Sequence, residues 1–154
     1  MIFKHQKLLY ALILMGGALL VYFLWLLLRP VEIVAVHEEG NHSSVLVKNF
    51  PLTDNAKINW WLKNKDTLKL KYDTPKPDAD GSYTVVFWLF GEGYKVEGKY
   101  DRRCFNDIQT RTNCIDKDSV MMIKKSKNSG LYFIVDDGIY RINNDGKIIK
   151  SRSQ

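Results

Sequence analysis

The cluster whose residue types could best support chemistry contains two histidines and two glutamates: His37, Glu38, Glu39 and His42. A zinc protease holds its metal with a His-Glu-x-x-His motif on a helix, because that spacing places both imidazoles on one helix face. Here the histidines are five residues apart, and Gly40 lies between them in a stretch typical of a turn. We interpret the cluster as the solvated tip of a β-hairpin, with a weak adventitious metal site as the alternative. No cofactor is predicted.

The common enzyme motifs are absent from the sequence. There is no Gly-x-Ser-x-Gly elbow and no phosphate-cradling loop that ends in Lys-Ser or Lys-Thr. Gly91-Glu92-Gly93 is not followed by the helix that a dinucleotide site requires, and Asp136-Asp137 lies in a turn that favours aspartate for its backbone geometry. We therefore do not expect an enzyme, although acid and base groups can also assemble from distant positions.

Three aromatic residues are candidates for contact with a partner protein: Trp60, Trp88 and Phe90. Trp60 falls about 160° around the predicted helix from Ile58, nearly opposite the apolar face. An outward tryptophan beside lysines is typical of a protein-binding hot spot or of the lipid interface; the alternative is that Trp60 packs under the loop at 75–81. Trp88 and Phe90 belong to a strand with apolar residues on both faces, which is either covered twice or covered once and used for binding.

Both cysteines, Cys104 and Cys114, lie in the later part of the chain. An isolated pair outside the cytoplasm indicates a disulfide, and closing a loop of about eleven residues stabilises a domain by about 3 kcal/mol in the chain-entropy model. The spacing matches no metal-binding or thioredoxin-type motif. Two free thiols are the remaining alternative.

All of these residues follow the uncharged apolar stretch Leu8–Leu28, which is the element that would anchor their domain. A helix of this length would cross a hydrocarbon core of about 30 Å. A cleavable signal peptide usually has a shorter apolar run that ends at a small-x-small site, whereas this run ends in Trp25 and three leucines before Arg29-Pro30. We predict an uncleaved signal anchor at residues 8–28.

Charge on either side of the span predicts its orientation. Lys4 and Lys7 precede it, whereas Arg29 is followed by acidic residues and by no further Lys or Arg until Lys48. The positive-inside tendency then predicts that residues 1–7 are cytoplasmic and residues 29–154 lie outside. Residues 31–154 contain 20 basic and 17 acidic residues, a net charge of +3 compared with +6 for the whole chain. This mild charge argues against nucleic-acid binding.

Beyond the span, the patterns predict an α+β domain, a small and mostly antiparallel β-sheet with one main α-helix. The helix begins near Asp54, capped by Thr53 or Asp54 itself, and ends near Tyr72. The first two strands form a hairpin around a turn at 37–42. The predicted strands are 31–36, 43–48, 82–90, 94–100, 120–124, 131–135, 139–142 and 147–150.

Several stretches spread along the chain resemble one known family: Leu28–His37, Ser43–Pro51, Lys57–Leu62, and Gly98–Asp101 followed by Cys104 and Cys114. The sequence resembles the enterobacterial putative membrane proteins gathered as the domain of unknown function 943 family. The resemblance implies a Gram-negative bacterium, hence an anchor in the inner membrane and a domain in the periplasm. It implies no activity, cofactor or site residue.

The leading hypothesis is a non-enzymatic, single-span inner-membrane protein whose periplasmic module binds another protein. One version is an immunity protein that neutralises a toxin delivered by a competing bacterium. One alternative is a subunit or assembly factor of an envelope complex, in which the span itself makes contacts. Another is a domain or enzyme that acts on lipid or cell wall, which requires a concave pocket with convergent polar groups.

Overall fold

The computed structural model describes residues 2–152 and divides the chain into two compact units, residues 1–30 and 31–154. The first unit is the helix α1 (Ile2–Leu28). Within the described residues it is the one helix that is long and apolar enough to cross a membrane. α1 begins before the predicted span, at Ile2, and ends at Leu28 because Pro30 lacks the amide that a helix interior needs.

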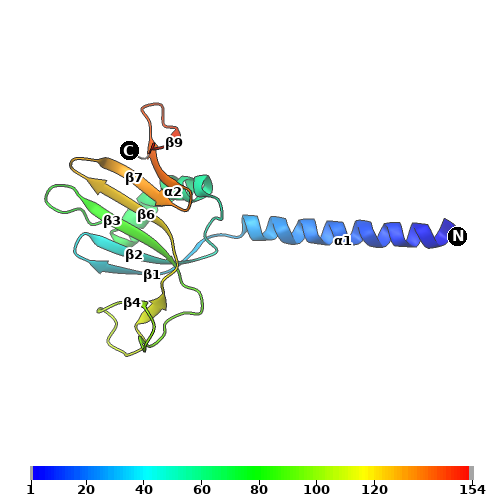
Figure 1. Ribbon diagram of the computed structural model, residues 1–154, viewed down its shortest axis with the longest axis horizontal. Helices are drawn as coiled ribbons and strands as arrows, with labels where there is room; N and C mark the ends of the chain where they lie inside the picture. Colours follow the sequence, from blue (N-terminus) through cyan, green and yellow to red (C-terminus); the bar gives the residue numbers. More distant parts are fainter. Residues whose placement is uncertain (1, 153–154) are drawn as a thin grey trace. The chain divides into compact units, whose positions relative to one another are not determined.

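The second unit is an α+β domain, as the sequence predicted (Figure 1). Its large sheet has seven strands in the order β1-β2-β3-β6-β7-β8-β9, and β4 pairs with β5 in a separate small sheet. Neighbouring strands are antiparallel except β2 and β3, which are parallel and are connected through α2. The elements are β1 (Glu32–Glu39), β2 (His42–Lys48), α2 (Asp54–Tyr72), β3 (Tyr83–Leu89), β4 (Arg102–Cys104), β5 (Cys114–Asp116), β6 (Ser119–Ser126), β7 (Gly130–Val135), β8 (Gly138–Ile142) and β9 (Ile148–Lys150).

Helix α2 covers one face of the large sheet. Thr53 caps it as predicted, because the Thr53 side chain accepts a hydrogen bond from the Ala56 amide, and Asp73 ends it in the left-handed conformation. Apolar side chains of α2 pack against alternate positions of the central strands and form the first core. Its buried members include Val45, Val47, Ile58, Trp61, Leu68, Val85, Phe87, Ile123 and Phe133.

Residues 90–118 leave the large sheet after β3 and return to it at β6; we call them the disulfide lobe (Figure 1). The pairing of β4 with β5 places Cys104 directly opposite Cys114, and their sulfur atoms lie at disulfide distance, 2.04 Å. Phe105 and Ile115 of the lobe bury Leu46 on the sheet face opposite α2, which forms a second core. The structure therefore confirms the predicted pairing of Cys104 with Cys114.

Two predictions are wrong, one for the disulfide lobe and one for the hairpin of β1 and β2. Residues 94–100 do not form a strand beyond one bridge from Lys95 to Cys114, because Gly93 and Gly98 adopt φ angles of +95° and +57°, which interrupt an extended run. The predicted turn at 37–42 is also too long, since β1 continues to Glu39 and the strands pair up to the hairpin turn. His37 is consequently only 7% exposed instead of solvated.

Candidate functional site

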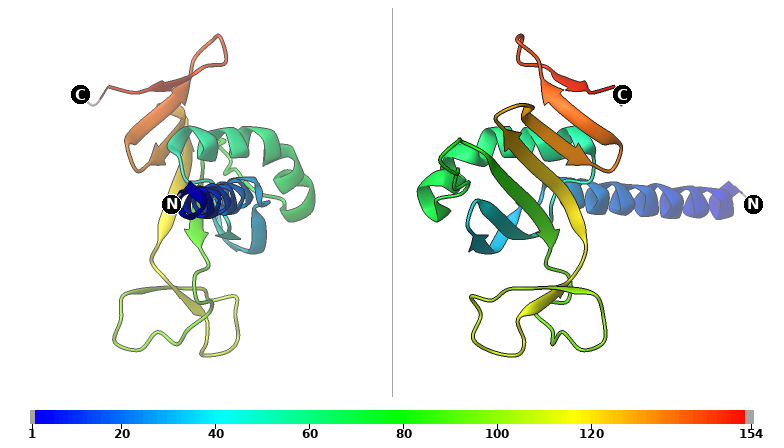
Figure 2. Two further views of the ribbon diagram at one scale, coloured as in Figure 1. Left: turned by 90° about the vertical axis from the view of Figure 1, so that its right-hand side faces the viewer. Right: turned by 60° about the vertical axis from the view of Figure 1, so that its left-hand side comes forward.

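The face of the large sheet opposite α2 carries an uncovered row of apolar side chains. Val86 of β3 pairs with Met122 of β6, Met122 with Ile134 of β7, and Ile134 with Ile139 of β8. With about 4.8 Å between strands, this row is about 14 Å long. In the right-hand view of Figure 2, α2 lies behind the sheet, and within residues 31–152 no other helix or strand crosses in front of β3, β6 and β7. We call these four side chains the open face.

Apolar residues at neighbouring positions on the same strands are fully buried when they face α2. Val85 and Ile123 point towards α2 and are completely buried, at 0% exposure. The open-face residues beside them stay partly exposed, and Ile139 reaches 41%. Contiguous apolar side chains at a surface mark interaction sites, whereas single exposed ones are ordinary. The open face is therefore the strongest candidate for a binding surface in the described part of the chain.

Positively charged side chains border the open face. The adjacent row across the strands holds His42, Thr84, Lys124 and Tyr132, and the guanidinium carbon of Arg141 lies 5.2 Å from the centre of the Tyr132 ring. A hollow of about 230 Å³ opens beside Thr84, Lys124 and Tyr132. Within the described residues, the register places no acidic residue on this face from β2 to β8. The open face with its positive border is therefore complementary to a partner surface that is apolar at its centre and acidic around it.

Trp60 packs at the edge of the first core. Its ring lies edge-to-face against Phe50 and Phe87, with centroid distances of 5.4 and 5.7 Å. Phe50, in the segment that leads into α2, supplies this contact in place of the loop at 75–81. α2 therefore buries a wider face than its apolar pattern predicts, and Trp60 is partly exposed. Its contact with a partner remains a prediction.

Trp88 and Phe90 lie where the disulfide lobe leaves the sheet, and both pack against the second core. Trp88 is on the same sheet face as Val86, so it borders the open face. Its indole Nε1 is buried with no hydrogen-bond partner among the described residues. Phe90 lies edge-to-face against Tyr94, with centroids 5.1 Å apart. Both residues thus have a packing role, and their contact with a partner remains a prediction.

His37 joins a carboxylate and a phenol in an arrangement that resembles a proton relay, although the sequence predicted a hairpin tip here. Its Nδ1 donates to Asp107 Oδ2 at 2.6 Å, its Nε2 shares a hydrogen bond of 2.8 Å with the Tyr94 hydroxyl, and its ring stacks on Phe105 at 4.1 Å. Burial, assisted by the negative charge of Asp107, raises the pKa of Tyr94. The two hydrogen bonds of the His37 ring join the disulfide lobe to β1.

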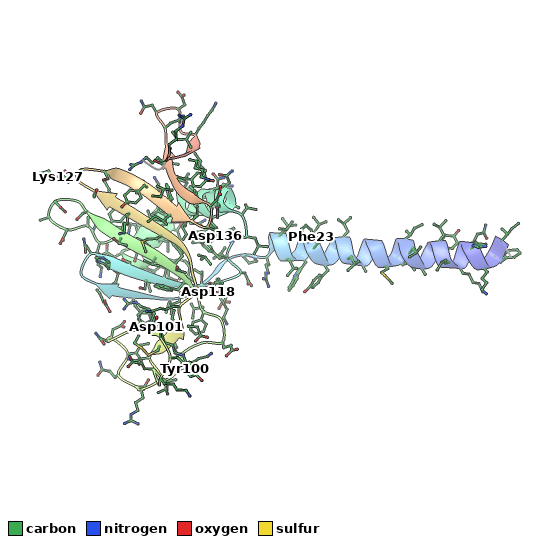
Figure 3. The ribbon with its side chains drawn as sticks, in the orientation of Figure 1. Phe23, Tyr100, Asp101, Asp118, Lys127 and Asp136 are labelled. Atoms are coloured by element: carbon green, nitrogen blue, oxygen red, sulfur yellow. A yellow bond between two sulfur atoms is a disulfide. The ribbon has the colours of Figure 1, made fainter. Side chains whose placement is uncertain are left out.

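Lys57, in the first turn of α2, is a buried cation. It is only 3% exposed, and its Nζ lies 3.2 Å from Asp136 Oδ2 and 3.6 Å from Asp54 Oδ1. Asp136 belongs to the turn between β7 and β8, near α2 (Figure 3). These ion pairs fix the beginning of α2 to that turn. Within residues 2–152, no group of three or more potential ligands is arranged to hold a metal ion.

Asp116 of β5 holds the base of the disulfide lobe through two cations. Its carboxylate accepts hydrogen bonds from Lys95 Nζ at 2.8 Å and from Arg102 Nε at 3.1 Å. The hydrogen bond from Lys95, together with that from Arg102, lowers the pKa of Asp116 below its ordinary value. A carboxyl whose pKa is lower in the folded state stabilises that state above the unfolded pKa and loses the effect as the pH falls through the folded pKa.

We therefore expect acidification from pH 6 to below about pH 4, the ordinary range of aspartate, to loosen the disulfide lobe. Amide hydrogen exchange of Ile115, corrected for intrinsic rates, should accelerate over this range. Asp116→Asn should show fast exchange already at pH 6 and a flatter pH dependence. Asp145→Asn, in the turn between β8 and β9, is the matched control and should behave as the wild type. Identical pH profiles for wild type and Asp116→Asn would contradict this role.

The described residues thus form a membrane-anchor type of protein. One candidate membrane-spanning helix is followed by a small α+β domain whose sheet has one uncovered face. The chain belongs to the enterobacterial putative membrane protein family known as domain of unknown function 943, whose family model matches residues 3–152. This confirms the family resemblance of the sequence. No curated protein and no solved structure matches the chain.

Proposed function

We propose that this protein is anchored in the bacterial inner membrane by α1 and binds a partner protein in the periplasm through the open face, without catalysing a reaction. One observation carries the proposal: four apolar side chains lie in register across β3, β6, β7 and β8 and stay partly exposed. An apolar centre with a charged border is the arrangement found in protein-binding surfaces.

The border specifies the chemistry of the partner. Lys124 and Arg141 flank the apolar row, and Tyr132 lies between them with the Arg141 guanidinium against its ring. Tyrosine and arginine are enriched among residues that dominate binding energies. A partner that inserts apolar side chains over Met122 and places carboxylates near the two cations satisfies both features. A toxin neutralised by an immunity protein is one such partner, and a resident envelope protein is another.

In-cell photocrosslinking tests the proposal directly. The full-length protein is produced in an enterobacterial cell with a photoreactive phenylalanine analogue at Ile139, the most exposed open-face residue. We expect one discrete crosslinked protein. Adding Met122→Glu places a negative charge at the apolar centre of the contact, where it faces the apolar and acidic side chains of the proposed partner, and should reduce the crosslink at least about tenfold, because a charge buried at an apolar contact is costly. Lys63→Glu, on the exposed side of α2, is the matched control and should leave it unchanged.

The same experiment separates the possible partners. A crosslink that forms in a pure culture identifies a resident envelope protein, and one that forms only beside a competing strain identifies a delivered toxin. A crosslink of equal yield in the Met122→Glu variant, or from a photoreactive residue at position 63 as readily as at 139, would overturn the assignment of the open face.

The periplasmic location requires its own test. Alkaline phosphatase fused after Gln154 should be active, because it folds and forms its disulfides only after export. A cytoplasmic reporter fused at the same position should be inactive. The reverse pattern would place residues 31–154 in the cytoplasm and remove the proposed partner class.

A further inference from the structure

A second concave surface, which we call the α2 groove, runs along α2 beside the start of β1. It has a volume of about 180 Å³ and is lined by residues that include Val31, Trp60, Asn64, Thr67, Lys71 and Tyr72. Its lining joins apolar and aromatic side chains to an amide, a hydroxyl and an ammonium. Tryptophan, tyrosine and lysine together are typical of membrane–water interfaces.

The length of the connecting chain limits where this groove can lie. Val31 lines the groove and is three residues beyond Leu28, the last residue of α1. Consecutive Cα atoms are 3.8 Å apart, so these two Cα atoms are separated by about 11 Å at most. With α1 across a bilayer, Leu28 lies at the edge of the hydrocarbon, beyond which the headgroup layer is about 5–7 Å thick. Any orientation of the domain therefore keeps Val31 in the headgroup layer or within a few ångströms of it.

Lys71 gives the α2 groove its charge. The neighbouring Lys69 is paired with Asp73, with 2.7 Å between Nζ and Oδ1, and this hydrogen bond lowers the pKa of Asp73. Among the described residues 2–152, no carboxylate forms an ion pair with Lys71. The groove thus presents a positive charge beside the Thr67 hydroxyl and the Asn64 amide, which also donates to the Trp60 carbonyl oxygen at 2.8 Å.

The size of the groove defines which part of a lipid fits. The groove is an open hollow of about 180 Å³, which is too small for a whole phospholipid. That volume accommodates a phosphate with its nearest polar atoms, while the acyl chains remain in the bilayer.

We infer that the α2 groove binds the phosphate headgroup of an anionic phospholipid, with Lys71 as its main electrostatic contact. The inference rests on the proposed anchoring of α1 in a membrane and is independent of the open face. Bound lipid would hold the domain in one orientation over the bilayer.

Lipid titration of the full-length protein in neutral detergent micelles tests the inference. The probes are short-chain phosphatidylglycerol and phosphatidylcholine, with inorganic phosphate as a third ligand, and the readout is the backbone amide shifts of Thr67 and Lys71. We expect saturable shifts with phosphatidylglycerol at an affinity at least about tenfold higher than for phosphatidylcholine. Lys71→Gln should abolish most of this preference. Lys127→Gln removes the same charge from the turn between β6 and β7 and should preserve it.

Three results would overturn the inference: equal affinity for the two lipids, a preference that survives Lys71→Gln, or equal shifts with inorganic phosphate, which would indicate an adventitious anion site only. None of them affects the crosslink from Ile139. Conversely, a missing crosslink with a retained lipid preference would remove the partner proposal and leave the α2 groove assigned.

Discussion

Replacing Phe87 by alanine is expected to lower the free energy of unfolding of the domain by about 3–5 kcal/mol. Phe87 is completely buried at the centre of the first core. Its ring stacks on Phe50 at 5.1 Å and lies edge-to-face against Trp60 and Trp61 at 5.7 and 6.0 Å. The substitution leaves a cavity beneath α2 and removes aromatic contacts that stabilise beyond their buried area. A domain of this size has a stability of about 5–15 kcal/mol, so the loss is a large fraction of it.

Denaturant unfolding of the full-length protein in micelles, followed by tryptophan fluorescence, measures this loss. Phe87→Leu keeps most of the buried volume and should lower the stability by less than about 1.5 kcal/mol. A loss below about 1 kcal/mol for Phe87→Ala would show that Phe87 is not the centre of the first core.

Phe105→Ala is expected to have an equally large effect that is confined to the disulfide lobe. Phe105 is completely buried, and its ring stacks on His37 with a centroid distance of 4.1 Å. Without this ring, the lobe loses most of the second core and the support of the His37 ring. The free energy for opening the lobe should fall by about 3–5 kcal/mol, while the first core on the opposite face of the sheet stays packed.

Native-state hydrogen exchange separates local from global opening. We expect the amide of Ile115 to lose its protection in Phe105→Ala while that of Phe133 in β7 keeps most of it. Phe105→Leu should retain protection at both sites. An equal loss at Ile115 and Phe133 would show that the two cores unfold as one unit.

Much of the fold could be predicted because its signals are local. The apolar run before Arg29-Pro30, the cap at Thr53 and the continuous apolar run of β3 each depend on a few adjacent residues, and the structure confirms the elements they predict. The pairing of Cys104 with Cys114 follows from there being only two cysteines.

The remaining features depend on contacts between distant residues. His37 is buried only because Asp107 and Tyr94, from the disulfide lobe, meet its two ring nitrogens. Lys57 is buried because Asp136, 79 residues further along the chain, lies beside it. No local pattern contains either contact.

The open face could not be predicted without the order and register of the strands in the sheet. The sequence indicated that the strand with Trp88 and Phe90 has two apolar faces. Only the register shows that the disulfide lobe covers the Trp88 end and leaves Val86 uncovered. The open face therefore lies beside Trp88, one of the three predicted aromatic residues, across strands that are neighbours in space but distant in sequence.

The disulfide lobe leaves and rejoins the large sheet between two paired strands, so its length can change while the strand order of the sheet stays the same. Trp88 near the end of β3 pairs directly with Ser119 at the start of β6, so the whole lobe is topologically one hairpin connection. Loop-closure entropy grows slowly, by about 0.6 kcal/mol for each doubling of loop length. Insertions and deletions within residues 90–118 can therefore accumulate over evolution without altering the sheet order. Because the lobe adjoins the open face at Trp88, such changes would reshape the border of that face while the sheet beneath it persists.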